Sequence, residues 1–271
     1  MPELPEVETI RKDLCSQILN KPLKNFFIYD KNFLKKNKIT LDTLKTLKGK
    51  RLLSIERKGK YLIFIFQEKA LIFHLGLTGA LIVNFHSLPE NYKNHHILTL
   101  EFEGNLLHFF DIRKFGRLYL LDRENLTEFY NQLGKDALEI SYEEFCMLLK
   151  GRIQKIKPFL LNQKLISGLG NIYIDEILFR AGIHPERLSN SLSEKELKSL
   201  YHNMINTLKE AISLRGSSVK NYVDGEGKRG SFQERHLVYG KRELPCPRCG
   251  IPLEYKKIAQ RGTTFCPHCQ K

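Results

Sequence analysis

Residues 246–269 read CPRCGIPLEYKKIAQRGTTFCPHC, and this stretch decides the fold of the C-terminal end of the chain. It holds two Cys-x-x-Cys pairs separated by sixteen residues. Four thiolates spaced in this way close a tetrahedral shell around zinc and leave no position open for water. Two redox-active pairs are the alternative, but the βαβ pattern that surrounds such pairs is missing. We therefore predict one structural Zn²⁺ bound by Cys246, Cys249, Cys266 and Cys269.

The residues between the two pairs predict a β-hairpin. Residues 253–257 and 263–265 have strand character and flank the tip Gln260-Arg261-Gly262. The metal would fix this hairpin so that its tip presents Arg261. An arginine at a tip is often only solvated, but this one lies in a strongly basic segment. That setting favours contact with a phosphate.

The basic residues are concentrated in two segments of the 271-residue chain, whose formal net charge is +14. Residues 21–60 include 13 basic and 3 acidic residues, and residues 215–271 include 12 basic and 5 acidic residues. Lysine and arginine set against phosphates release condensed counterions, so this charge favours a polyanionic partner. A solvated basic coat is the alternative. The length suggests two domains and excludes a small disulfide-stapled module.

No membrane or secretion signal is found in the sequence. The apolar runs are of strand length, far short of the roughly 18–20 residues that span a bilayer. The N-terminus, MPELPEVETI, lacks a basic region followed by an apolar stretch. We expect a cytoplasmic protein without membrane contact, whose cysteines stay reduced.

Hydrophobic periodicity divides the chain into a β-rich part and a helical part. Pro5 at a first helical position, followed by apolar residues at three- and four-residue spacings, predicts an N-terminal helix. Short apolar strands separated by turn residues predict an antiparallel sandwich over residues 48–121. Helical patterns follow, the last of them at 193–214 with a Ser193–Glu196 capping box and Gly216 as its stop. Residues 217–232 predict a long mobile loop, and loops of this length in compact proteins are often functional or disordered.

A glycine-rich turn, Gly168-Leu-Gly170-Asn171, joins two of the predicted helices. Free N–H groups at a helix start bind phosphate, and glycines let it approach closely. We expect Asn171 to cap the second helix. The turn is only moderately specific, because helix-turn-helix units contain glycine for steric reasons as well.

The N-terminal residues also suggest chemistry. Loss of Met1 would expose the secondary amine of Pro2, and an α-amino group is partly neutral near pH 7. Such an amine attacks a sugar carbon and gives an iminium ion, while Glu3 beside it serves as general acid or base. A proline tolerated at a flexible terminus is the alternative.

Seven motifs in chain order give the sequence a resemblance to the bacterial formamidopyrimidine-DNA glycosylase family. They cover essentially the whole chain: MPELPEVET (1–9), RKGKYL (57–62), HLGLTG (74–79), DIRKFG (111–116), GLGNIYIDE (168–176), AGIHP (181–185) and QRGTTFCPHCQK (260–271). The resemblance implies a glycosylase that removes oxidised purines, chiefly 8-oxoguanine and formamidopyrimidines, and then cleaves the strand by β,δ-elimination. The PELPEV start favours this family over endonuclease VIII, which acts on oxidised pyrimidines. A non-catalytic zinc-ribbon DNA-binding protein is the alternative from another class.

The resemblance also assigns roles to residues. It makes Pro2 the Schiff-base nucleophile, Glu3 the acid that opens the sugar, and Glu6 a supporting carboxylate. It places Lys60, His74, Asn171, Tyr239 and Arg261 on phosphates. It makes Arg113, Phe115 and Leu77 the residues that fill the gap left by the extruded base, where the family commonly has methionine instead of Leu77. Lys220 lies in the loop that would capture the base.

The expected fold is α+β and multidomain. An N-terminal helix plus antiparallel β-sandwich would form the catalytic domain at 1–130. A helix-two-turn-helix DNA-binding domain with the capture loop at 217–232 would span 131–235, and a four-cysteine zinc ribbon 236–271. We expect a bacterial, nucleoid-associated monomer that binds double-stranded DNA containing oxidised bases, with one structural Zn²⁺ as its only cofactor.

Overall fold

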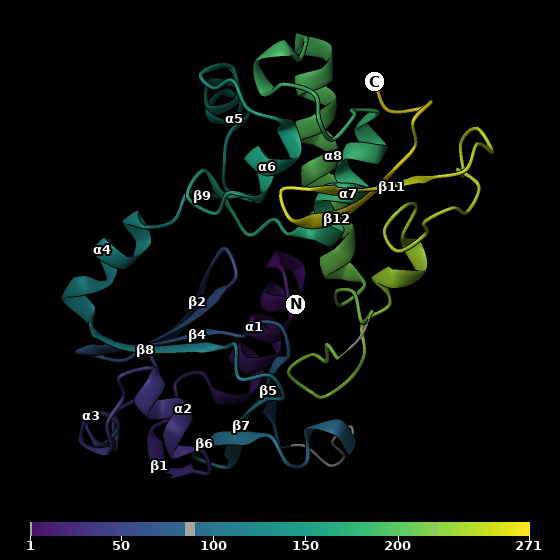
Figure 1. The fold of residues 1–271 in the computed structure, drawn as a ribbon. Coiled ribbons are helices and arrows are strands. Elements are labelled where there is room, and N and C mark those ends of the chain that lie inside the picture. The colour runs from purple at the N-terminus through teal and green to yellow at the C-terminus, as the bar shows by residue number, and fades with distance from the viewer. Residues whose placement is uncertain (1, 85–89, 220) are drawn as a thin grey trace. The chain divides into compact units, whose positions relative to one another are not determined.

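The computed structural model describes residues 2–84, 90–219 and 221–271 (Figure 1). The chain divides into two compact units, each built from two separate stretches. The first unit comprises Met1–Gln132 and Leu214–Gln233, and the second comprises Leu133–Ser213 and Glu234–Lys271. Lys220, predicted to lie in the capture loop, is outside the described residues. No helix in the described part of the chain is long and apolar enough to cross a membrane.

The first unit contains two four-stranded antiparallel sheets and the N-terminal helix α1 (Leu4–Ile18). One sheet has the order β1 (Leu23–Ile28), β6 (His96–Phe102), β7 (Asn105–Asp111) and β5 (Gly79–Val83). The other has the order β2 (Ser54–Lys58), β3 (Tyr61–Ile65), β4 (Lys69–His74) and β8 (Arg117–Asp122). The short helices are α2 (Lys31–Lys36), α3 (Leu41–Lys45) and α4 (Leu126–Asn131).

One hydrophobic core joins α1 to both sheets. The helix contributes Val7, Ile10, Leu14 and Ile18, all fully buried, and these are the apolar positions that its sequence periodicity marks. Buried aliphatic and aromatic side chains from both sheets pack in the same cluster. The short apolar runs predicted as strands of a sandwich over residues 48–121 correspond to β3, β4, β5, β6, β7 and β8. Because α1 packs into this core, the positions of Pro2 and Glu3, the residues just before it, are restrained too.

The second unit is helical, with a C-terminal hairpin. Its helices are α5 (Tyr142–Lys150), α6 (Ile156–Leu161), α7 (Asn171–Ala181) and α8 (Glu194–Ser213). The predicted capping box is present at the start of α8, where the backbone N–H of Glu196 donates to Ser193 Oγ at 3.3 Å. Two residue pairs, β9 (Lys135–Asp136) and β10 (Ile166–Ser167), form a short parallel ladder. The hairpin consists of β11 (Glu254–Ile258) and β12 (Arg261–Phe265).

Within the first unit, the segment 214–233 is attached to α1 through an ion-pair cluster. Arg215 reaches Asp13 at 2.7 Å and Asp224 at 2.6 Å, and the Gly225 N–H donates to the same Asp13 carboxylate at 3.0 Å. Arg215 itself has a left-handed backbone, with φ 61°, directly after α8. The predicted loop thus has a fixed base on the N-terminal helix.

Candidate functional site

The first two carboxylates of the chain are buried together at the start of α1. Glu3 is the N-cap residue, and its backbone N–H donates to Glu6 Oε2 at 2.7 Å. The two side chains form a capping box, and they are 3 and 1 % exposed. Pro2, the residue before Glu3, is buried as well. The structure therefore joins Glu3 to Glu6 and buries all three N-terminal residues that the sequence singles out.

The second oxygen of the Glu6 carboxylate binds the segment 214–233. The Ser217 N–H donates to Glu6 Oε1 at 2.8 Å. Gly216 has φ +82°, and a Cβ there would lie 2.8 Å from Glu6 Cγ. Only glycine fits both the left-handed backbone and this close approach. Sequence reasoning predicts Gly216 as a helix stop but misses its contact with Glu6.

Lys60 and His74 are neighbours at one end of the β2–β3–β4 sheet. Lys60 is in the two-residue turn between β2 and β3 and is only 6 % exposed. Tyr61, next to it, pairs across the strands with His74. Burial, then the charges of Lys60 and Arg117, lowers the pKa of His74 to about 4. His74 is therefore neutral at pH 7, and its Nδ1 accepts the Gly76 N–H at 3.3 Å.

The Glu8 carboxylate, one turn into α1, holds the strand that leads to Lys60. Arg57 Nε donates to Glu8 Oε2 at 3.0 Å, and Arg57 Nη1 donates to the Gly59 carbonyl at 3.1 Å. Burial raises the pKa of Glu8, but the hydrogen bonds and charges of Arg11 and Arg57 outweigh it and keep that pKa below its usual value. Glu8 therefore stays ionised and fixes the turn.

Two loops that carry predicted gap-filling residues are tied together by Thr78 and Asp111. The Thr78 hydroxyl donates to Asp111 Oδ1 at 2.7 Å and accepts the Arg113 N–H at 2.9 Å. The other Asp111 oxygen accepts the Gly116 N–H at 2.7 Å. Asp111 is completely buried. Neither Thr78 nor Asp111 is assigned a role from the sequence, although both lie inside the motifs HLGLTG and DIRKFG.

The three gap-filling residues lie on these two loops. Leu77 is half-buried in the turn between β4 and β5. Phe115 follows β7 and is 50 % exposed, which excludes a core role, and the Arg113 guanidinium lies 4.7 Å from its ring centre. Lys114 between them has φ 52° and is held by Asp30 at 2.6 Å. The loop thus offers an exposed aromatic ring on a fixed backbone.

Asn171 and Arg261 are brought close through one carbonyl group of the hairpin. Asn171 Nδ2 donates to the Gly262 carbonyl at 2.8 Å, and Arg261 is the exposed residue just before it. The prediction that Asn171 caps α7 is wrong. Gly170 is the N-cap, and Asn171 is the first helical residue because its side chain is directed at the hairpin instead. Its Oδ1 is buried and has no partner among the described residues.

Two adjacent carboxylates on α7 position the C-terminal segments. Asp175 pairs with Lys157 and accepts the Thr264 N–H of β12 at 3.2 Å. Glu176 accepts the backbone N–H groups of residues 237, 238 and 239 at 2.9–3.0 Å. This contact fixes the backbone of Tyr239, one of the predicted phosphate contacts. Sequence reasoning missed both roles, although two adjacent acids inside a largely apolar helix are a signal.

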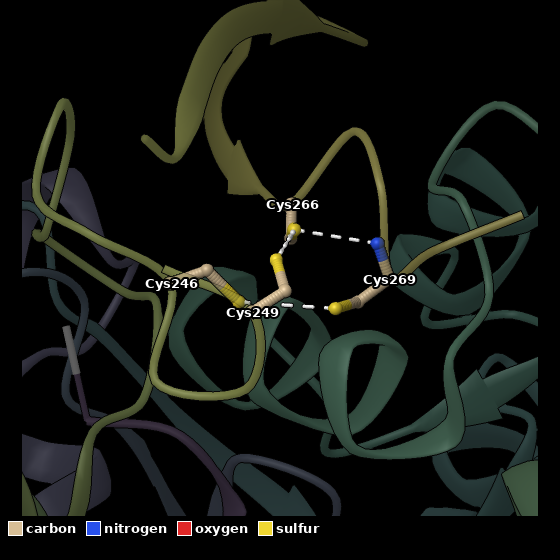
Figure 2. Close-up of side chains that lie close together, drawn as sticks. All are labelled: Cys246, Cys249, Cys266 and Cys269. Atoms are coloured by element: carbon tan, nitrogen blue, oxygen red, sulfur yellow. Dashed lines mark hydrogen bonds between the residues drawn. The ribbon is translucent and has the colours of Figure 1, made fainter. Parts of the chain in front are cut away.

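The four predicted zinc ligands converge on one point (Figure 2). Their Sγ atoms all lie within 4.8 Å of one another, a spacing that fits one ion at the centre of a tetrahedral cysteine site. His268 in the second pair is exposed and outside this group, which leaves the cysteines as the ligand set. Gln270 anchors the second pair, accepting the Cys266 N–H at 2.8 Å and donating to the Ile183 carbonyl at 2.9 Å.

Three family models match successive parts of the chain. Residues 1–118 match the N-terminal domain of formamidopyrimidine-DNA glycosylase, and residues 133–223 match its H2TH domain. Residues 243–271 match a zinc finger found in FPG and IleRS. These matches and the cysteine cluster confirm the predicted fold class of β-sandwich, helix-two-turn-helix domain and four-cysteine zinc ribbon. They also support one structural zinc ion.

Full-length relatives give the same result. The formamidopyrimidine-DNA glycosylase of Bacillus subtilis is 40 % identical, with 100 % of this chain and 99 % of that protein covered. That of Heliobacterium modesticaldum is also 40 % identical over the full length of both chains. A Lactococcus lactis FPG mutant in complex with a Fapy-dG containing DNA superposes with a TM-score of 0.89, at 36 % identity over 100 % of both chains. A structure of MutM with carbocyclic 8-oxo-G containing DNA gives the same TM-score, identity and coverage. The chain therefore belongs to the formamidopyrimidine-DNA glycosylase family.

Proposed function

We propose that this protein is a bifunctional DNA-repair enzyme. It removes oxidised purines, chiefly 8-oxoguanine and formamidopyrimidines, from double-stranded DNA and then cleaves the strand at the abasic site. Family membership over the full length supports this activity. The observation in the structure that carries it is the buried pair Glu3 and Glu6 directly after Pro2 in the chain, because an amine in its neutral form is a nucleophile and a neighbouring carboxyl group can supply the acid–base steps of both reactions.

The proposed chemistry starts with the Pro2 amine, once Met1 has been removed. The nitrogen attacks C1′ of the damaged nucleotide, the C1′–N9 bond breaks, and the base leaves with a proton. Glu3 protonates the ring oxygen of the sugar, so that the ring opens and an iminium ion forms on Pro2. Loss of a C2′ proton then expels the 3′ phosphate, and loss of a C4′ proton expels the 5′ phosphate. Water finally hydrolyses the iminium and restores the amine.

The remaining predicted residues would hold and distort the DNA. Extruding a nucleotide costs a few kcal/mol, which phosphate contacts and inserted side chains offset. We assign phosphate contacts to Lys60, His74, Asn171, Tyr239 and Arg261. Arg113, Phe115 and Leu77 would fill the gap in the helix, a role that suits the exposed ring of Phe115. Lys220 would act in capture of the base.

The domain boundaries 1–130, 131–235 and 236–271 stay a proposal, as do the monomeric state and a location with the nucleoid in the bacterial cytoplasm. The four cysteines would hold zinc in a purely structural role, keeping the hairpin of Arg261 folded. No step of the reaction passes through the metal, because four thiolate ligands leave it no open position.

Borohydride trapping tests the proposal directly. Protein verified by mass to lack Met1 is mixed with a duplex that holds 8-oxoguanine opposite cytosine, and borohydride should reduce the iminium to a stable adduct on Pro2. Glu3→Gln should give no adduct with the 8-oxoguanine duplex, because its side chain cannot protonate the ring oxygen. Pro5→Ala changes the proline three residues after Pro2 and should keep trapping at Pro2. Absence of an adduct, or an adduct on a lysine, would overturn the role of Pro2. Faster excision of thymine glycol than of 8-oxoguanine would favour the endonuclease VIII-like activity.

A further inference from the structure

A cavity of about 450 Å³ in the first unit is not used by the proposed reaction. It lies between β1, α2 and α3, which are neighbours in Figure 1. Its interior is apolar, and Leu41 at its edge is 50 % exposed. The apolar lining residues are Ile28, Leu34, Ile39 and Leu41. A cavity of this size and lining falls within the range of ligand sites and has room for a large apolar side chain.

Three exposed lysines, Lys31, Lys35 and Lys38, also line the cavity. In the part of the chain that the structure describes, the nearby acids are already engaged. Asp30 pairs with Lys114 at 2.6 Å, and Asp42 pairs with Lys45 at 2.8 Å. The cavity therefore combines an apolar interior with three cations whose acidic sequence neighbours are bound to other lysines.

The walls of the cavity are held in place by local hydrogen bonds. The Asp30 carboxylate caps α2 by accepting the Phe33 N–H at 2.9 Å. Thr40 and Thr43 form a capping box at the start of α3. Phe33 and Leu34 anchor α2 in the core with 2 and 4 % exposure. A preformed site of this kind needs little ordering when a ligand binds.

We propose that this cavity docks an acidic peptide segment of a partner protein, with one bulky apolar side chain inserted between Leu34 and Leu41. Lys31 and Lys35 are one helical turn apart, about 6 Å along the axis, and Lys38 lies just beyond the helix end. A ligand with a single carboxylate, such as a fatty acid, would pair with only one of these cations and leave the others without a partner in the complex. In an extended chain, carboxylates two residues apart lie on the same face, about 6.6 Å from each other, which is close to the spacing of Lys31 and Lys35.

The apolar interior also argues against nucleic acid as the occupant. Phosphates stay solvated or bind to cations, and burying one among aliphatic side chains would cost several kcal/mol. DNA could bind to the three lysines through its phosphates, but the apolar cavity behind them would then stay unfilled. A segment with acidic residues next to a phenylalanine or leucine uses both parts of the site.

Fluorescence anisotropy of a labelled peptide tests the proposal. The probe has the sequence Asp-Asp-Glu-Leu-Phe, and two control peptides replace the acids by serine or the Leu-Phe pair by Ser-Ser. The full-length protein is compared with two triple variants of equal charge. One is Lys31→Gln/Lys35→Gln/Lys38→Gln at the cavity, and the other is Lys195→Gln/Lys198→Gln/Lys209→Gln on the exposed face of α8. Leu41→Ser removes the exposed apolar edge.

We expect the probe to bind with a Kd of roughly 10–100 µM, typical of a short peptide. The cavity triple variant and Leu41→Ser should each weaken binding about tenfold or more, and the α8 variant less than twofold. Both control peptides should bind at least tenfold more weakly than the probe. Equal loss in the two triple variants, or equal binding of the Ser-Ser peptide, would overturn the proposal in favour of non-specific charge attraction. Displacement of the probe by dodecanoate with higher affinity would identify a lipid site instead, and displacement by undamaged duplex DNA a nucleic-acid surface.

Discussion

Lys157 Nζ lies 2.5 Å from Asp175 Oδ1 in the interior of the second unit, and the two side chains are 0 and 1 % exposed. The pair connects α6 and α7 to the hairpin. Lys157 also reaches the Gly262 carbonyl at 3.4 Å, and the other Asp175 oxygen accepts the Thr264 N–H. Because desolvation offsets the attraction of a buried ion pair, its role here is to set the position of the hairpin.

Removing one partner of this pair should destabilise the protein strongly. Above pH 7, where Asp175 is ionised, Lys157→Met leaves its carboxylate buried without a cation, and we expect the free energy of unfolding to fall by about 3–5 kcal/mol. The double variant Lys157→Met/Asp175→Leu removes both charges and should recover most of this loss. Urea unfolding of the zinc-loaded proteins measures both. A double variant no more stable than Lys157→Met would contradict the account.

The raised pKa of Asp175 leads us to expect that the stability of the protein depends on pH. Burial raises the pKa of Asp175 to about 7, against the opposing influence of Lys157. In the unfolded chain that pKa is near 4. Between these values the folded protein binds a proton that the unfolded chain does not, so stability falls as pH rises towards 7. Relative to Asp175→Asn, the wild type should lose about 2 kcal/mol of unfolding free energy between pH 5.5 and 7.5. If the difference in unfolding free energy between wild type and Asp175→Asn, measured by urea unfolding, is the same at both pH values, this assignment is refuted.

The Thr78 hydroxyl should matter for base excision, because it ties the loop of Leu77 to the loop of Phe115. Thr78→Val removes the donor to Asp111 and the acceptor for the Arg113 N–H. We expect a loss of about 1–3 kcal/mol in stability and a lower rate of excision. Thr78→Ser keeps the hydroxyl and is the matched control. Single-turnover excision of 8-oxoguanine gives the comparison, and equal rates for the two variants would count against a positioning role.

Loss of zinc should weaken DNA binding while the N-terminal site stays intact. Cys249→Ser removes one ligand, so the hairpin that carries Arg261 should unfold or move, because structural zinc supplies folding energy. We expect affinity for an abasic duplex to fall roughly tenfold or more. Trapping at Pro2 should persist at saturating DNA. Cys146→Ser, which lies outside the cysteine cluster, is the control. If the affinity for the abasic duplex is unchanged after verified loss of zinc, the hairpin does not contribute to DNA binding.

Arg261 should act through charge on a phosphate. Arg261→Gln should lower DNA affinity and reduce the slope of log K against log salt by about 0.9, the value for one released counterion. Lys195→Gln on α8 gives the same charge change at an exposed position outside the proposed contacts. An Arg261→Gln slope equal to that of the wild type would exclude a phosphate contact.

Much of the fold follows from local pattern. Apolar spacing in α1, the short apolar runs in 48–121 and the capping box of Ser193 and Glu196 are properties of neighbouring residues. Each could therefore be predicted without a structure. The zinc ligands could be found in the same way, because a metal with four thiolates requires two close pairs. Asn171 shows the limit of this reasoning. Its helix start is visible in the sequence, but its partner, the Gly262 carbonyl, is 91 residues away.

The family, the metal site and the chemical groups available at the N-terminus follow from the sequence, since they depend on residue identity and short spacing. Which of those groups meet depends on the packing of the folded chain. Packing placed Glu6 against Gly216 and Ser217, Thr78 against Asp111, and Asp175 against Lys157 and the hairpin. Such contacts join residues far apart in the chain, and only the closed core fixes their distances and removes the water that would otherwise weaken them.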